Sequence, residues 1–255
     1  AFMGNHLVMQ CYGLLYGCFC WPEFKIVPKI TRFAAKTIQK ELFSRQVYAD
    51  GAQKEVSSLI QLVTITHFEP FYDLCKVMKI KLDDTYWTKI MDMWNYLAYS
   101  IHPNGTTELN NDSNVYNLRE LLKKIAEKFN RPDWLFIATS GLMGTDPANF
   151  LKSAESSSQL LLKQIHYSTN SYVFPYAGHV ILRNSFEPTA EYLFFDIGPS
   201  GISPTYLHFD KLHISLSIGK EDFLVDSGAY RHVRDRWRLQ YFKHTRGHNT
   251  ISIED

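Results

Sequence analysis

Three short segments near the C-terminal end of the sequence carry residue types that bind metal ions. His208, Asp210 and His213 lie in the first segment, Asp226 in the second and His248 in the third. Imidazole and carboxylate groups from separate segments are ligands that zinc and similar divalent ions prefer, and three such ligands leave a position for water. Spacing alone leaves another interpretation open, in which each histidine is a hydrogen-bonded imidazole in or beside the core.

Aromatic and arginine residues alternate between the second and third of these segments. The residues that could bind a ligand there are Tyr230, Arg234, Trp237, Arg238 and Tyr241. Aromatic rings stack on sugar rings, and guanidinium groups bind carboxylate or sulfate through two hydrogen bonds. A solvated, charged loop is the alternative interpretation. The formal net charge is only +1, from 27 Lys+Arg and 26 Asp+Glu. This balance argues against nucleic-acid binding, so we expect an acidic partner to be held locally.

Strands are expected to position these segments. Short runs rich in β-branched and aromatic residues, bounded by Gly and Pro, predict antiparallel strands. Strict alternation over residues 213–218 directs Ile214, Leu216 and Ile218 to one face, and residues 219–222 resemble a hairpin loop. The predicted strands span Tyr172–Arg183, Glu191–Ile197, Leu212–Ile218, Phe223–Val225 and Thr250–Ile253.

The sequence up to about Phe150 is typical of amphipathic helices, because apolar residues recur every three to four positions. The run from Leu7 to Trp21 is too short and too often interrupted for a membrane span, so it predicts a buried helix. Its cysteines and Cys75 are expected to be buried free thiols, because no Cys-x-x-Cys pair is present. The predicted faces are Ile30/Phe33/Ala34/Ile38/Leu42, Tyr86/Ile90/Met93/Leu97 and Leu118/Leu121/Leu122/Ile125/Phe129.

The change from helical to strand pattern divides the chain. We expect an α+β, multidomain protein with a helical domain at residues 1–155 and an antiparallel β-domain at residues 156–255. The first residues contain neither an initiator Met nor a signal segment. The chain therefore looks like a piece of a longer precursor.

The sequence of the three candidate metal-binding segments resembles that of a known family. The run HFDKLHISLSIGKEDFLVDSGAYRH, followed by YFKHTRGHNTISI, is similar to the His-x-Asp-x-Leu-Ser, Leu-Val-Asp-x-Gly-x-Tyr and His-Asn-Thr signature of heparinase II/III-like polysaccharide lyases. That group includes oligoalginate, heparin and chondroitin lyases. Further matches cover nearly the whole chain: GNHLVMQCYGLLYG, YADGAQKEVSS, HPNGTTELNNDS, VFPYAGHVILRN and FFDIGPSG.

The resemblance implies part of an (α/α)-toroid followed by part of an antiparallel β-sandwich. It implies a structural divalent metal, with zinc expected, on His208, Asp226 and His248, and a supporting role for Asp210. The implied activity is β-elimination on an acidic polysaccharide or oligosaccharide, outside the cell or in the periplasm. The resemblance does not indicate which oligomeric state the protein has.

The expected catalytic residues follow from the same resemblance. Asn5 and His6 match the pair that neutralises the substrate carboxylate, although Asn5 could instead begin a helix as its N-cap. The sequence departs from the pattern at two proton-transfer positions. The stretch in which the family usually carries a catalytic tyrosine contains none here and has Ile60 and Gln61 instead. Tyr206 replaces the usual histidine two residues before His208. Tyr206 is then the expected proton-transfer group, on the same side of a strand as His208, with Tyr230 and Tyr241 next.

Three other functions remain open at this point. A uronyl epimerase would share the proton abstraction, and a non-catalytic relative would bind the sugar without cutting it. A metal hydrolase would use the same three ligands to activate water. Formation of unsaturated uronate separates a lyase from all three, because only elimination creates the new double bond.

Overall fold

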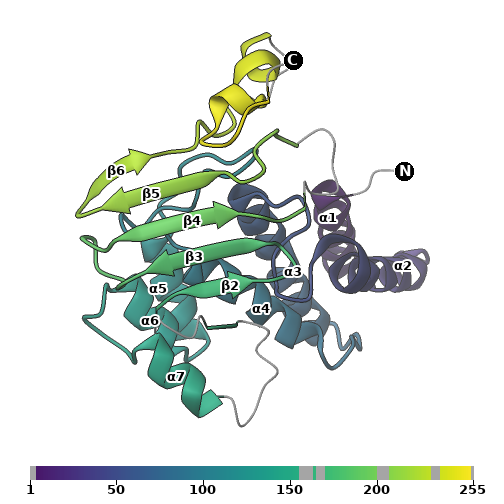
Figure 1. Ribbon diagram of the computed structural model, residues 1–255. Helices are drawn as coiled ribbons and strands as arrows, with labels where there is room; N and C mark the ends of the chain where they lie inside the picture. Colours follow the sequence, from purple (N-terminus) through teal and green to yellow (C-terminus); the bar gives the residue numbers. More distant parts are fainter. Residues whose placement is uncertain (1–3, 155–162, 165–169, 200–206, 231–235, 254–255) are drawn as a thin grey trace.

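A computed structural model describes residues 4–154, 163–164, 170–199, 207–230 and 236–253. Helices come first along the chain and an antiparallel sheet follows, with the helices behind one face of the sheet (Figure 1). The α+β class and this order confirm the prediction. The helices before the sheet are α1 Asn5–Cys20, α2 Val27–Lys40, the π-helix η1 Glu41–Gln46, α3 Ser58–Val77, α4 Tyr86–Tyr99, α5 Arg119–Lys128, α6 Pro132–Ala138 and α7 Pro147–Ala154. The π-helix η2 Arg238–Phe242 and the 3-10 helix η3 Thr245–Gly247 follow the sheet.

The apolar spacing predicted most helix faces correctly. All four predicted residues of α4 are buried, and so are Leu118, Leu122 and Ile125 of the α5 segment. Ile30, Leu121 and Phe129 are partly buried, and Phe33 of α2 is exposed, with 55% of its surface accessible. Phe33 lies at the edge of the buried α2 face, which contains Ala34 and Ile38. Helical periodicity alone therefore did not show that the Phe33 side chain is exposed.

The prediction of a buried helix over Leu7–Trp21 is only partly correct. One face of α1 is buried through Val8, Cys11, Leu15 and Cys18, but Leu14, Tyr16, Phe19 and Trp21 of the same segment are exposed. The buried face packs against α2 and α3. The cysteines are free thiols, and those at positions 11, 18 and 75 are buried as expected, whereas Cys20 is exposed. Within the described ranges, no helix combines the length and apolar composition needed to cross a membrane.

The sheet is a six-stranded antiparallel meander in which each strand pairs with the next in sequence. The turn at Gly178, with φ +70°, splits the predicted strand Tyr172–Arg183 into a hairpin. The described residues form one sheet, so they do not include the second layer of the predicted sandwich. The strands are β1 Lys163–Gln164, β2 Tyr172–Phe174, β3 His179–Arg183, β4 Tyr192–Asp196, β5 Ile214–Ile218 and β6 Glu221–Leu224.

Two further strand predictions need correction. Residues 250–253 are not a strand, because Asn249 and Thr250 bond to loops and strand ends: Asn249 donates to the carbonyls of Ile214 and Val225, and Thr250 donates to the carbonyl of Lys211. The predicted strand Leu212–Ile218 begins at Ile214, because Leu212 has φ +65°, which extended backbone does not allow.

Strand β5 alternates as predicted, but its buried face is the polar one. Ser215 and Ser217 are 3% exposed, whereas Ile218 on the other face is 42% exposed. Ser215 donates to the Glu108 carboxylate at 2.7 Å, and Ser217 contacts His102 Nε2 at 2.7 Å. The polar face points inward because the loop after α4 supplies polar partners there.

The helices and the sheet share one core. The Tyr96 ring packs edge-on against Phe174 with centroids 4.8 Å apart, and Tyr99 packs against Tyr172 at 4.6 Å. The Tyr192 hydroxyl donates to the Ser100 carbonyl and to Glu108, both at 3.1 Å. Helix α4 therefore fixes the position of the sheet relative to the helical layer.

The turn before α3 attaches the helical layer to the hairpin between β2 and β3. Asp50 is buried, and its Oδ2 accepts hydrogen bonds from the backbone amides of Tyr176 at 2.7 Å and Ala177 at 2.9 Å. Its Oδ1 accepts a third from the amide of Ala52 at 3.3 Å. One carboxylate thus satisfies buried amides from both layers.

Replacing Asp50 by alanine is expected to destabilise the chain by about 2 to 4 kcal/mol, because buried amides lose their acceptor. Chemical denaturation measures the change. Replacing the exposed Asp84 by alanine is the control and is expected to change stability by less than about 0.5 kcal/mol. Equal stability of the two variants would show that the Asp50 contacts do not hold the layers together.

Candidate functional site

Polar segments from both layers meet at the loop 110–113. The Asn110 side chain accepts from the Ser58 hydroxyl at 2.8 Å and donates to the Val56 carbonyl at 2.6 Å. Asn111 donates to the same carbonyl at 3.1 Å, and the hydroxyls of Ser113 and Ser57 are 2.9 Å apart. These contacts fix the segment 55–58, just before α3, against the loop.

Val56 has an unusual backbone conformation at this junction. Its φ is +49°, in the left-handed region that β-branched residues rarely adopt. Asn111, which donates to the Val56 carbonyl, has φ +53°. Such conformations persist only where surrounding contacts impose them, and they concentrate at functional sites.

The C-terminal segments contact the other side of the same loop. Asn111 Oδ1 accepts from the His208 amide at 3.2 Å, and the Ser113 carbonyl accepts from the Ala229 amide at 3.0 Å. Asp112, which is fully buried, has His208 Nε2 2.9 Å from one oxygen and the Arg238 guanidinium on the other. The loop 110–113 therefore joins both halves of the chain.

Asp112 is the electrostatic centre of this junction. Burial alone would raise the pKa of its carboxyl, but the hydrogen bonds from His208 and Arg238 outweigh burial and hold that pKa below its usual value. The group is therefore a carboxylate at neutral pH. His208 Nε2 thus faces the Asp112 carboxylate, and its Nδ1 has no hydrogen-bond partner among the described residues.

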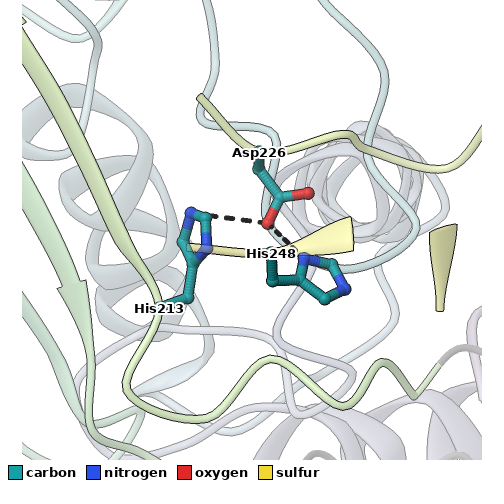
Figure 2. A group of neighbouring side chains, drawn as sticks. All are labelled: His213, Asp226 and His248. Atoms are coloured by element: carbon teal, nitrogen blue, oxygen red, sulfur yellow. Dashed lines mark hydrogen bonds and ion pairs between the residues drawn. The ribbon is translucent and has the colours of Figure 1, made fainter. Parts of the chain in front are cut away.

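A second buried cluster contains His213, Asp226 and His248 (Figure 2), whose potential ligand atoms all lie within 4.8 Å of one another. Asp226 Oδ2 is 2.9 Å from His248 Nδ1 and 3.4 Å from His213 Nε2. Of the residues expected to bind metal, Asp226 and His248 thus lie together. His213 is the third member of this cluster. His208 is not among these three, although its ring centroid lies 5.2 Å from that of His248.

A chain of hydrogen bonds determines the tautomer of His213. Its Nδ1 accepts from the Asn249 backbone amide at 3.1 Å, so Nε2 carries the proton of the neutral ring. That proton faces Ser215 Oγ at 3.0 Å, and Ser215 donates onward to Glu108. His213 is therefore a hydrogen-bond donor beside Asp226 in this arrangement.

His208 has the features of a metal ligand that His213 lacks. Metal-binding histidines typically donate their second ring nitrogen to a carboxylate, as His208 does to Asp112. Among the described residues, its Nδ1 is buried and has no hydrogen-bond partner, and the same holds for Nε2 of His248. Asp210 Oδ1 has no hydrogen-bond partner there either, but it lies 3.6 Å from Lys211 Nζ. Two imidazoles and nearby carboxylates with unused lone pairs fit a divalent ion such as zinc.

The charge at this cluster also favours a cation. Burial lowers the pKa of His248, but the hydrogen bond and negative charge of Asp226 outweigh it and raise that pKa above its usual value. Burial raises the pKa of Asp210, although Lys211 nearby lowers it. The carboxylates thus stabilise positive charge in a site enclosed by the protein.

The N-terminal end of α1 lies against Glu55, beside the same junction. Glu55 is buried, its Oε1 accepts from Gln53 at 3.1 Å, and its Oε2 makes no hydrogen bond. Burial raises the pKa of this carboxyl, against the hydrogen bonds from Gln53 and the Asn5 amide and the charge of His6. Asn5 is 5% exposed and His6 is exposed, so the helix presents His6 to solvent next to a buried acid.

The expected substrate-binding residues separate into two groups. Trp237 is 68% exposed and Tyr241 44%, whereas Arg238 is buried and paired with Asp112. Arg238 therefore supports the site from inside, because its charge is already matched there. Tyr230 is 41% exposed and stacks on Phe242 with ring centroids 4.5 Å apart. Arg234 lies outside the described residues.

The proton-transfer positions are also placed. Ile60 is buried in the first turn of α3, and the Gln61 side chain bonds to the backbone of Gly51, Met93 and Gln53. Tyr206 lies outside the described residues. The strand that was expected to carry His208 is not formed, because residues 207–213 are not a strand.

Sequence reasoning missed three residues that organise the site: Asp112, Glu108 and Glu55. Asp112 and Glu108 lie in a polar stretch between helices, where a carboxylate has no periodic neighbour to mark it as buried. The resemblance of residues 48–58 and 102–113 to family loops was the available signal.

Comparison with known proteins agrees with this architecture. The family model described as Heparinase II/III N-terminus matches residues 1–135, and the one described as Heparinase II/III-like, C-terminal, matches residues 167–255. The heparin-sulfate lyase of Pedobacter heparinus is 23% identical over 270 residues, covering 100% of this chain and 37% of that protein. The heparin-sulfate lyase of Bacteroides stercoris is 22% identical, covering 99% and 36%.

Solved structures show the same fold. A heparinase III crystal structure superposes with a TM-score of 0.81 at 20% identity, covering 98% of this chain and 39% of that one. The heparan sulfate lyase of Pedobacter heparinus superposes with a TM-score of 0.74 at 21% identity, covering 98% and 37%. The chain thus spans little more than a third of the length of these relatives. With its two halves matched by the N-terminal and C-terminal family models, the chain belongs to the heparinase II/III family.

Proposed function

We propose that this chain is part of a polysaccharide lyase that cleaves a uronate-containing glycan by β-elimination. The observation that carries the proposal is the loop 110–113, which holds the segment before α3, His208 and Arg238 in one buried network. This network places polar groups from both halves of a family lyase around one junction. The full activity, the substrate and the surrounding (α/α)-toroid are proposals, because the chain spans only part of its relatives.

The first chemical task is to neutralise the substrate carboxylate, so that the neighbouring carbon can lose its proton. We assign Asn5 and His6 to this task. They open α1, where the helix dipole favours negative charge. Glu55 occupies the same helix end and accepts from the Asn5 amide, so it orients the first turn.

Proton transfer is assigned to Tyr206, with Tyr230 as the second candidate. Ile60 cannot transfer a proton, and Gln61 is bonded to backbone groups. Removing a general acid or base typically costs about two to four powers of ten in rate. Tyr206→Phe is therefore expected to lose most turnover, whereas Ile60→Ala acts through packing. Full activity of Tyr206→Phe would assign the role to Tyr230 or Tyr241.

The β-domain is proposed to hold a structural divalent metal, with zinc expected. His208, Asp226 and His248 would hold it: the rings of His208 and His248 have centroids 5.2 Å apart, and Asp226 Oδ2 lies 2.9 Å from His248 Nδ1. Bound there, the ion would tie three segments of the chain together. His213, whose Nε2 contacts Ser215 Oγ at 3.0 Å and lies 3.4 Å from Asp226 Oδ2, would support Asp226 from outside the ligand set.

The substrate class follows from the relatives, which are heparin-sulfate lyases. We propose a sulfated glycosaminoglycan, with Trp237, Tyr241 and Arg234 as contacts to sugar and charge. The proposed compartment is the periplasm or the cell exterior. In a longer protein, a second sheet would complete the β-sandwich by covering the face that exposes Leu182, Ile218 and Leu224.

Product analysis over a panel of heparan sulfate, heparin, chondroitin sulfate, hyaluronan and alginate tests the function. A lyase produces unsaturated uronate, seen as rising ultraviolet absorbance, together with new reducing ends. New reducing ends without unsaturation would identify the metal hydrolase, and exchange of the uronate proton without cleavage would identify the epimerase. Binding without any product would identify the non-catalytic relative.

A further inference from the structure

A basic groove lies outside the candidate site, between α2 and the loop from α3 to α4. It has a volume of about 720 Å³. Four cationic side chains line it, and Asp83 is the one acidic residue among the lining residues. The cations are Arg32, Lys36, Lys40 and Lys81.

The cations on α2 form a stripe. Lys29, Arg32, Lys36 and Lys40 recur every three or four residues, so they share one helix face, opposite the buried Ala34 and Ile38. At a rise of 1.5 Å per residue the stripe is about 16 Å long. It is therefore long enough to follow an extended polymer past more than one repeating unit.

These charges, on the stripe residues and Lys81, have no ion-pair partner among the residues that the structure describes. The Asp83 carboxylate accepts hydrogen bonds from the Thr85 amide at 2.9 Å and from the Thr85 hydroxyl, so it is turned toward its own loop. Exposed like charges along one face repel one another. A bound polyanion would remove the free-energy cost of this repulsion.

The groove also offers apolar surface. Phe43 and Ile80 line it beside the cations, and Phe43 is 36% exposed. Cationic groups flanking an aromatic ring suit a ligand with alternating anionic groups and sugar rings.

We propose that this groove is a second binding site for a sulfated glycosaminoglycan, which holds the polymer while another part of it occupies the catalytic site. The choice of ligand rests on the proposed function. The groove shares no residue with the candidate site, so binding there is separable from catalysis.

The test compares Lys36→Gln/Lys40→Gln with Lys123→Gln/Lys124→Gln on α5, which removes the same charge elsewhere. Kd for a heparan sulfate polymer is measured at several salt concentrations, after confirming equal melting temperatures. The groove variant is expected to bind about tenfold more weakly, since two exposed ion pairs together contribute on the order of the 1.4 kcal/mol that corresponds to a factor of ten. Its affinity should also depend less on salt, because fewer ion pairs are screened. The control is expected to bind within about twofold of the parent chain.

Equal binding by the two variants would overturn the proposal, and so would stronger binding of the parent chain to single-stranded DNA or hyaluronan than to heparan sulfate. Turnover of a short oligosaccharide should not change in the groove variant. If the parent chain binds heparan sulfate through the groove but forms no unsaturated product, the proposed lyase activity is wrong. The proposed binding site in the groove is then still supported. If product forms and the groove variant binds normally, the groove assignment alone fails.

Discussion

Replacing Asp112 by alanine is expected to destabilise the chain by about 3 to 5 kcal/mol, because removing one member of a buried charge network leaves the others without compensation. His208 and Arg238 both bond to this carboxylate. For a chain of this size, such a loss corresponds to a fall in melting temperature of about 10 °C. Differential scanning fluorimetry of purified protein measures it.

The matched control is Asp73→Ala, which removes an exposed carboxylate 3.4 Å from Lys128. It is expected to change stability by less than about 1 kcal/mol. Asp112→Asn keeps one acceptor oxygen and should fall between the parent chain and Asp112→Ala. A normal melting temperature for Asp112→Ala would show that the loop 110–113 does not join the two halves as described.

Replacing His208 or His248 by alanine is expected to weaken zinc binding by about two to three powers of ten. A structural zinc site contributes roughly 10 to 16 kcal/mol, shared among its few ligands. Both variants should also lose the rise in melting temperature that zinc gives the parent chain. Titration calorimetry and thermal melts with and without zinc provide independent readouts.

His213→Ala separates the two possible ligand sets. As a neighbour of Asp226 outside the ligand set, His213 should contribute about tenfold in affinity, in the range of groups that support ligands from outside. A loss as large as that of His208→Ala would make it a ligand. His67→Ala, in α3 outside the cluster, is the control and should bind zinc normally. Unchanged zinc binding by His248→Ala would contradict the proposed site.

The sequence predicted those parts of the fold that depend on repeated local patterns. The buried faces of α4 and α5 and the alternation of β5 follow from the periodicity of one element. The prediction of one strand over Tyr172–Arg183 was wrong because the turn at Gly178 lies inside an otherwise continuous apolar run. The Thr250–Ile253 run failed because its β-branched residues follow Asn249, which bonds to other segments.

The site was harder to predict because its geometry depends on partners far apart in sequence. Family resemblance pointed to Asp226 and His248, which lie together, but it could not show that His213 joins them. That arrangement needs the Asn249 amide, which reaches His213 only in the fold. Likewise, the sequence predicted Arg238 as a substrate-binding residue. In the fold, Asp112, which is distant in sequence, pairs with Arg238 inside the protein.

We propose that Asn5 and His6, at the start of α1, neutralise the carboxylate of a uronate during β-elimination. The direct measurement is the rate of ultraviolet absorbance rise with heparan sulfate, for the parent chain and for Asn5→Ala. We predict a measurable rise for the parent chain and a rate lower by about two to three powers of ten for Asn5→Ala, as for loss of other groups that stabilise developing negative charge. Equal melting temperatures would attribute the difference to chemistry. Equal rates in the two proteins, or no rise with the parent chain, would contradict the claim.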